Sequence, residues 1–223
     1  MRWRLLEVDL FVNSKNSVYL ERMPRKYELK ARAERQAQTA RRIVEAAIEL
    51  HEAIGPARTS ITAIAERAGV GRLSVYRHFP AETDLLAACS TLYWERNPPP
   101  DSEAWRHIPD RVERFRVALR ETYAYHRRTE PMISRALADV GEEPVMAPYH
   151  AHWAQAADSV AAAWRLRGRE RRRVRAAVGH ALAFTTWRSL TRGQALSNNE
   201  AIELMVRLVC CQDDLRADEV LSG

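Results

Sequence analysis

Apolar residues recur at every third or fourth position through most of this 223-residue chain, which is the period of an amphipathic helix. Stretches in which β-branched and polar residues alternate, as they would in strands, are nearly absent. From about Leu29 to Ala53 the apolar positions share one helical face, and Gly55-Pro56 ends that helix. The pattern predicts an all-α fold with further helices at about 61–68, 72–78, 82–94, 110–128, 131–140, 147–167, 170–192 and 198–216.

Prolines and glycines separate the predicted helices. The run from Asn97 to Pro100 is the clearest interruption, while Pro131 suits the first turn of a helix and Gly168 suits a C-terminal cap. Ser197 and Glu200 have the spacing of a capping box ahead of the last helix. We therefore predict a small N-terminal domain over residues 24–85 and a larger helical domain over residues 86–223.

The first 23 residues differ from the rest of the chain, because residues 1–22 show no helical period. Met23-Pro24-Arg25-Lys26 looks like a natural beginning of a chain. We expect that Met23 is the physiological start or that residues 1–23 form a loose, disordered extension. The opening residues resemble the start of a signal peptide, but Glu7 and Asp9 interrupt the apolar run.

The net charge of +6 is concentrated in one segment. Residues 24–80 hold 11 Lys and Arg against 6 Asp and Glu, whereas residues 81–223 hold 20 of each. This balance favours an anionic partner for the small domain. Three cysteines are too few to stabilise a domain of this size by disulfide bonds. No apolar run reaches the roughly 18–20 residues that cross a bilayer. We expect a cytoplasmic protein with no membrane segment.

The segment from Thr59 to Phe79 has the pattern of a helix-turn-helix. Ser60 can cap the first helix, and Gly69 supplies the left-handed residue that a sharp turn requires. The apolar positions of the first helix pack inward, and Val75 packs the second helix against it. The side chains then left to line the exposed side and the end of the second helix are Arg72, Ser74, Tyr76, Arg77 and His78. Such side chains contact base edges and phosphates when a helix enters a major groove.

These residues carry a family resemblance. From about Ala37 to Leu86 the chain resembles the DNA-binding domain of the tetracycline-repressor (TetR/AcrR) family of bacterial regulators. The resemblance rests on Thr59-Ser60-Ile61, Ile64-Ala65, Ala68-Gly69-Val70, Ser74-Val75-Tyr76, His78-Phe79-Pro80 and Leu85-Leu86. It implies an N-terminal three-helix helix-turn-helix domain, followed by a larger C-terminal helical domain for ligand binding and dimerisation.

The resemblance also implies roles for single residues. Positions that reach base edges in the family are occupied by Arg72, Leu73, Ser74 and Arg77. Positions that hold phosphates are occupied by Tyr76 and His78, and Ser60 and Thr62 begin the supporting helix, where phosphate contacts are also common.

Two positions depart from the family pattern. Gly71 stands where a serine is frequent, so the second helix lacks a side-chain cap. Glu82 stands where a lysine is usual, and a carboxylate cannot hold phosphate. We expect other groups to compensate, namely the helix N-terminus or Lys26, Lys30, Arg41 and Arg42.

Aromatic residues are frequent in the larger domain. Each is more readily explained as core, but together they would suit an apolar pocket for a small molecule between helices. The candidate pocket residues are Trp105, Tyr123, His126, Trp153 and Trp187.

The last two long helices carry wider apolar surfaces than one core-facing stripe needs. Two such helices from each of two subunits would form a four-helix interface of a homodimer, and the resemblance favours this over burial within one subunit. The candidate interface residues are Val174, Val178, Ala181, Leu182, Thr185, Leu204, Met205 and Leu208.

Signatures of catalysis are missing from the sequence: there is no phosphate-binding glycine loop, nucleophile elbow or carboxylate pair. His150 and His152 lack the spacing of metal ligands on a helix, so we expect no enzyme, metal site or cofactor. The prediction is a homodimeric regulator, most simply a repressor, that binds a pseudo-palindromic operator in double-stranded DNA and is released by a small-molecule inducer. The alternatives are a sequence-tolerant architectural DNA-binding protein without an effector, and an enzyme or ligand carrier with a vestigial basic domain.

Overall fold

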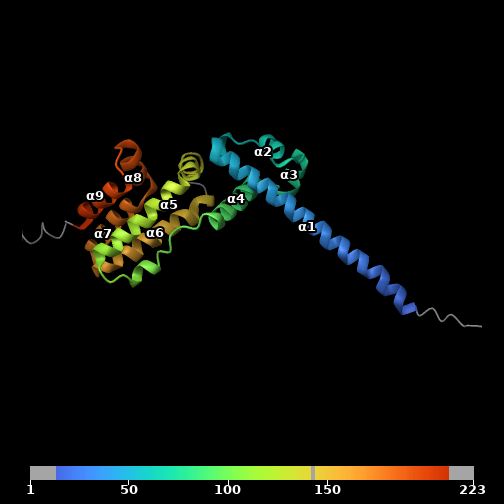
Figure 1. Cartoon of the computed structure of the whole chain (residues 1–223), viewed down its shortest axis with the longest axis horizontal. Helices are drawn as coiled ribbons and strands as arrows, with labels where there is room; N and C mark the ends of the chain where they lie inside the picture. Colours follow the sequence, from blue (N-terminus) through green and yellow to red (C-terminus); the bar gives the residue numbers. More distant parts are fainter. Residues whose placement is uncertain (1–13, 142–143, 211–223) are drawn as a thin grey trace, which may run out of the picture.

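The computed structural model describes residues 14–141 and 144–210, and in this part of the chain every regular element is a helix. Nine α-helices succeed one another along these residues (Figure 1). They are α1 (Ser14–Ile54), α2 (Ile61–Ala68), α3 (Arg72–His78), α4 (Glu82–Arg96), α5 (Arg111–Val140), α6 (Ala147–Ala161), α7 (Gly168–Leu182), α8 (Phe184–Arg188) and α9 (Asn198–Cys210). The predicted all-α fold is confirmed.

Helices α2 and α3 pack on the C-terminal half of α1, and α4, which crosses the predicted domain boundary at residue 85, packs on the same core. The division into two domains at this position stays a prediction. The shared core is formed by Ile43 and Ala47 of α1, Ile64 of α2, Val75 of α3 and Leu85 of α4, all of which are buried. These are the inward positions of the predicted periodicity, so local pattern and tertiary packing agree here.

The first helix is much longer than its sequence pattern indicates. We predicted a helix from about residue 29 and no helical period before residue 23, yet α1 begins at Ser14 and runs unbroken to Ile54. Its N-terminal half extends away from the rest of the protein (Figure 1). An apolar stripe marks only the part of a helix that packs on a core, so the periodicity indicated α1 only from about residue 29. Residues 1–13 lie outside the described part, and the choice of start codon stays a prediction.

The larger domain packs α5 against α6, α7 and α9 around a second core rich in aromatic side chains. We predicted that Pro131 would begin a new helix, and this was wrong, since Pro131 lies inside the continuous helix α5. Pro131 is exposed, while Thr129 and Met132 on either side of it are buried. The buried face of a thirty-residue helix offsets the roughly 3 kcal/mol that an interior proline costs.

Two further boundaries were also predicted wrongly. Gly168 does not cap α6; Arg165 takes the left-handed conformation after it, with φ 52°, and Gly168 begins α7. The predicted helix 170–192 is interrupted at Ala183, whose backbone is extended with φ −67° and ψ 140°. This break exposes the carbonyls of Ala181 and Leu182, which accept hydrogen bonds from Tyr123 Oη (3.0 Å) and His126 Nε2 (2.9 Å).

The last helix begins as predicted. Ser197 N–H donates to Glu200 Oε2 at 2.8 Å, and Glu200 N–H donates to Ser197 Oγ at 3.3 Å, which completes the capping box. No helix in the described residues is long and apolar enough to span a membrane.

Candidate nucleic-acid interface

The supporting helix α2 is fixed at its N-terminus by Ser60. Ser60 has an extended backbone, with φ −94°, and its Oγ accepts a hydrogen bond from Ala63 N–H at 3.1 Å. Ile64, Ala65 and Ala68 form the buried face of α2, and Ser60 and Thr62 are exposed at its start. The predicted N-cap is therefore confirmed, and both hydroxyls at this end of α2 are open to a partner.

The turn between α2 and α3 depends on Gly69, which adopts φ 64° and ψ 41°. This left-handed residue lets Val70 N–H donate back to Ala65 O at 3.0 Å and Gly69 N–H donate to Glu66 O at 3.1 Å. Gly71 then precedes α3 with φ −76° and forms no side-chain cap, as its sequence predicts. The two helices thus form a compact helix-turn-helix.

Helix α3 buries Val75 completely and leaves most of its other side chains in solvent. Leu73 is 74% exposed and Tyr76 43% exposed, which is unusual for apolar side chains on a helix this short. Arg72 and Arg77 are exposed too, whereas Ser74 and His78 are half-buried. The exposed face offers two guanidinium groups, one phenol and one aliphatic side chain to a partner.

The arginines of α3 differ from those of the neighbouring helices because they form no ion pair among the described residues. Arg67 of α2 pairs with Glu49 at 3.2 Å, and Arg41 of α1 pairs with Glu45 at 3.1 Å. Within the described residues, neither Arg72 nor Arg77 has an acidic partner. Unpaired guanidinium groups on a protruding helix are suited to guanine edges and phosphates, because nothing must be displaced before they bind.

The surroundings of α3 agree with the two departures noted in the sequence. Glu82 is exposed in the first turn of α4, and Asp84 accepts the Ala81 N–H at 3.2 Å, so this helix start carries negative charge. Among the expected compensating groups, Arg42 is exposed on α1, and Lys30 pairs with Glu34 at 3.9 Å. The side chain of Lys26 lies outside the described residues.

The candidate pocket residues gather largely in the core of the larger domain. Ring centroids of Trp153, Trp187 and Tyr123 lie 5.0, 5.8 and 6.5 Å from that of His126. Trp105 lies elsewhere in this core and donates from Nε1 to Glu121 Oε2 at 2.7 Å. All but the half-buried Trp153 are at most 1% exposed. Burial lowers the pKa of His126 to about 4, with the Leu182 O hydrogen bond acting the other way.

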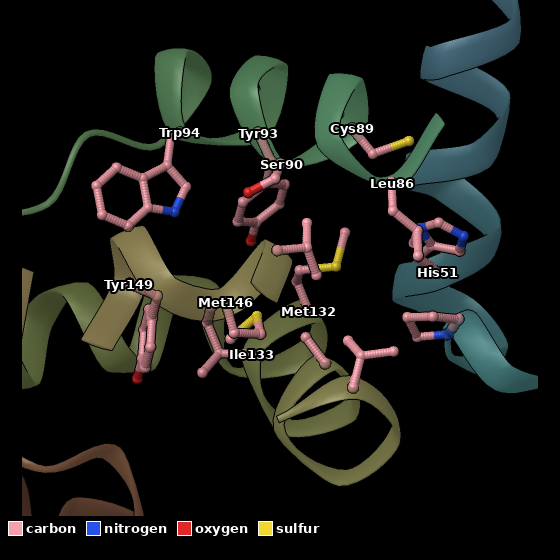
Figure 2. Close-up of a pocket in the computed structure, with 14 residues that line it drawn as sticks. His51, Leu86, Cys89, Ser90, Tyr93, Trp94, Met132, Ile133, Met146 and Tyr149 are labelled. Carbon is pink, nitrogen blue, oxygen red and sulfur yellow. The ribbon is translucent and has the colours of Figure 1, made fainter. Parts of the chain in front are cut away.

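None of these five residues lines an apolar cavity that lies beside this core. That cavity lies between α1, α4, α5 and the start of α6 and is lined by residues such as His51, Leu86 and Met132 (Figure 2). Sequence reasoning missed it, because its walls come from segments about 80 positions apart in the chain, and no local motif marks them. The role of the five aromatic residues in ligand binding stays a prediction.

The candidate interface residues divide into two groups. Val178, Ala181, Leu182 and Met205 are buried in the chain's own core, and Val174 is half-buried. Thr185 is exposed on α8, and Leu204 and Leu208 are exposed one turn apart on α9, by 37% and 57%. The surface that could meet a second copy is therefore smaller than the sequence indicates and centres on α9.

Comparisons with known proteins agree with this geometry. Residues 43–89 match the family model described as bacterial regulatory proteins of the tetR family. The match runs from the second half of α1 into α4 and includes the predicted contact residues of α2 and α3 and the preceding Ser60. The compensating residues Lys26, Lys30, Arg41 and Arg42 lie before it. Among curated proteins, none matches the chain significantly.

Solved structures share the fold of about three quarters of the chain. A TetR-like transcriptional regulator from Rhodococcus sp. RHA1 aligns with a TM-score of 0.58 at 16% identity, over 77% of this chain and 93% of its own. A linker-substituted mutant of HlyIIR aligns with 0.55 at 14% identity, over 77% and 94%. The multidrug binding protein EbrR, complexed with imidazole, aligns with 0.50 at 22% identity, over 75% and 88%.

Proposed function

We propose that this chain, a transcriptional regulator of the TetR family, acts as a homodimeric repressor that binds a pseudo-palindromic operator and leaves it when a small molecule binds. The observation that carries the proposal is the exposed face of α3, where Arg72 and Arg77 lack acidic partners beside the exposed Leu73 and Tyr76. Guanidinium groups, a phenol and an aliphatic side chain on one exposed helix face are the groups that contact base edges, phosphates and thymine methyl groups in a major groove.

Each side chain of this interface has a chemical task in the proposal. Arg72 and Arg77 fork to guanine O6 and N7, Leu73 packs on a thymine methyl group, and Ser74 bonds a base edge at closer range. Tyr76 and His78 donate to phosphate oxygens, which sets the register of α3 in the major groove.

The start of α2 supplies further phosphate contacts. Ser60 Oγ accepts from Ala63 N–H, so its own O–H remains to donate to a phosphate oxygen. Thr62 does the same from the first turn of α2. The carboxylate of Glu82 repels the phosphate backbone of DNA at a position where the family usually has a lysine. Arg42 and the other basic residues of α1 supply the missing phosphate contact in this chain.

Two copies of α3 must reach two half-sites about one helical turn of DNA apart, or slightly more. We propose that α9, through Leu204 and Leu208, contributes to the interface that holds them at this spacing. An inducer bound in the larger domain changes the spacing, so inducer and operator weaken each other's binding by the same factor. The chain would work in the cytoplasm, and regulators of this family are generally not enzymes.

The experiment that tests the proposal is the selection of genomic DNA fragments by the purified full-length chain. A repressor enriches a small set of fragments that share an inverted repeat. Retention of all fragments alike, lost as salt rises, would indicate the sequence-tolerant architectural protein instead. If no duplex is retained at moderate salt, the proposal is wrong.

A further inference from the structure

The start of α7 carries the densest positive charge of the chain. Residues 165–175 contain seven arginines and one glutamate. Because α7 begins at Gly168, these arginines occupy the turn before α7 and its first two turns. The function proposed for α3 uses none of them, so this concentration of charge needs an explanation of its own.

Nearby carboxylates pair with three of the seven arginines. Asp158 of α6 accepts hydrogen bonds from Arg175 Nε at 2.7 Å and Nη2 at 3.1 Å, and it lies 3.9 Å from Arg171. Glu170 pairs with Arg173 at 3.1 Å. The other four are exposed and have no acidic partner among the described residues, and they are Arg165, Arg167, Arg169 and Arg172. We call these four residues the arginine patch.

The arginine patch does not serve the stability of α7. The N-terminus of a helix carries partial positive charge, which favours acidic side chains and disfavours basic ones. Arg169 in the first turn and Arg172 in the second turn both oppose this preference, and Arg167 at the N-cap position forms no side-chain cap. These arginines are therefore unfavourable for the isolated helix, and an anionic partner would offset that cost.

The side chains around the patch narrow the class of anionic partner. Leu166 and Val174, the apolar residues of the segment, are half-buried against the core of the larger domain. The large apolar side chains that are exposed in the described residues all lie outside residues 165–175, at Leu29, Leu73, Tyr76, Leu204 and Leu208. The segment thus offers no side chain that inserts into a membrane or stacks on unpaired bases, and no apolar centre of a protein interface.

The phosphate backbone of a duplex needs none of these apolar groups. It presents a dense row of fixed negative charges, and basic side chains bind it without reading the sequence. Arginine suits this task because its planar guanidinium group donates two parallel hydrogen bonds to one phosphate. All seven basic residues of the segment are arginines, and none is a lysine.

The arginine patch and α3 are far apart in the chain's structure. Figure 1 shows α7 in the larger domain, on the far side of α4 from α3. The ring centroid of Trp164, just before the patch, lies 6.3 Å from that of Phe115 near the start of α5. Near the other end of α5, Asp139 accepts a hydrogen bond from Ala57 N–H in the turn before α2. At 1.5 Å per residue, α5 separates these two contacts by about 36 Å. The patch and α3 are therefore two separate surfaces.

We infer that the arginine patch is a second DNA contact surface, which binds the phosphate backbone of a duplex without reading its sequence. A chain that holds its operator at α3 then holds another segment of duplex at the start of α7. The contact at the patch does not rest on the function proposed for α3, and only the joining of two DNA segments does.

The first test measures how the affinity for a base-scrambled duplex depends on salt. It uses the full-length chain with Arg72→Ala and Arg77→Ala, which lacks the arginines of α3. Adding Arg169→Gln and Arg172→Gln should weaken binding at low salt. It should also reduce the slope of log affinity against log salt by about two, since each lost phosphate contact removes about 0.9.

The matched control removes the same charge from another surface. Arg120→Gln with Arg127→Gln changes two exposed arginines of α5 that have no acidic partner among the described residues, and it should leave the slope unchanged. Equal slopes in the patch and control variants would overturn the inference. Poly-glutamate or phosphatidylserine vesicles that bind the patch more tightly than the duplex at the same salt would overturn the choice of DNA as its partner.

The second test measures the joining of two duplexes. The parent chain, bound to an immobilised operator, should capture a labelled base-scrambled duplex. Arg169→Gln with Arg172→Gln should lose most of this capture at unchanged operator affinity, and the α5 control should keep it. Undiminished capture by the patch variant would overturn the joining of two segments. A parent chain that binds no operator would contradict the proposed function alone, because the first test does not involve an operator.

Discussion

Arg77 and Arg72 are exposed on α3 without acidic partners among the described residues, whereas Arg67 and Arg41 on the neighbouring helices are held in ion pairs. A guanidinium group that is already paired must give up its partner to bind DNA, so part of the contact energy is lost. The unpaired arginines of α3 would bind without that loss, which supports our proposal that α3 reads the DNA sequence.

Replacing Arg77 with Ala removes a base contact in our account. We expect the affinity for a selected operator to fall by about 1–3 kcal/mol and the preference for one base position to relax. Competition binding against operators substituted at each position measures both effects. Arg169→Ala, at an exposed position of α7, is the matched control and should bind like the parent. An unchanged base preference in the Arg77 variant would remove this residue from the reading set.

His126 makes stability depend on pH. Its folded pKa of about 4 lies below the usual value near 6.5, because burial disfavours the charged ring. The unfolded chain therefore binds one more proton between these pH values, so stability is complete above pH 6.5 and falls as pH drops toward 4. The total loss is roughly 3 kcal/mol.

The measurement is the free energy of unfolding from denaturant titrations between pH 7 and pH 4. His126→Gln keeps a donor for Leu182 O but does not titrate, so its slope against pH should be lower by about one proton. Ala176→Gln, at an exposed position of α7 and without a titrating group, is the control and should keep the parental slope. Identical slopes in all three proteins would show that His126 does not titrate as its burial implies.

Among the elements, the helix-turn-helix depends on Gly69, which ends α2, while Gly71 leaves the start of α3 without a side-chain cap. Gly69→Ala places a Cβ at φ 64°, where it meets no neighbour, so the cost is backbone strain alone, about 1–2 kcal/mol. Gly71→Ser adds the missing cap to α3 and should raise the free energy of unfolding by a few tenths of a kcal/mol. Gly193→Ala, without positive φ or a close contact, controls for the added methyl group. Equal stabilities of the Gly69 and Gly193 variants would refute the assigned turn.

The bounds of a helix could be predicted where residues within one turn of its ends determine them. The helices from Ile61 to His78 were predicted with the observed bounds, because Ser60, Gly69 and Phe79-Pro80 act within one turn. The continuity of α5 through Pro131 and the break at Ala183 could not be predicted in this way. Both are stabilised by contacts from distant helices, such as the hydrogen bonds of Tyr123 and His126 to the carbonyls before the break.

The residues of the candidate sites also differ in whether they come from one continuous segment or are brought together by packing. The helices α2 and α3 were predicted from the sequence, since they form one continuous segment with a characteristic spacing, and the DNA contacts of their residues stay a prediction. The cavity at the domain junction was not found, because His51, Leu86 and Met132 are brought together only by the packing of α1, α4 and α5. The aromatic residues chosen instead lie in the core of the larger domain, most of them around His126.

At the scale of the whole molecule, the proposed dimer depends on the exposed leucines of α9. The double variant Leu204→Glu with Leu208→Glu places charges in the interface, while a single chain tolerates them because both positions are exposed. We expect sedimentation to give twice 25.6 kDa for the parent and 25.6 kDa for the variant. Leu29→Glu, at a 66% exposed position on α1, is the control and should stay dimeric. A dimeric double variant would place the interface elsewhere.

The central claim is that this chain reads sequence in duplex DNA, and the affinity ratio between a selected operator and a base-scrambled duplex of equal length tests it most directly. Measured at one physiological salt concentration, the account predicts a ratio of roughly a thousand or more, with two chains bound per operator. A ratio near one at that salt concentration would contradict it.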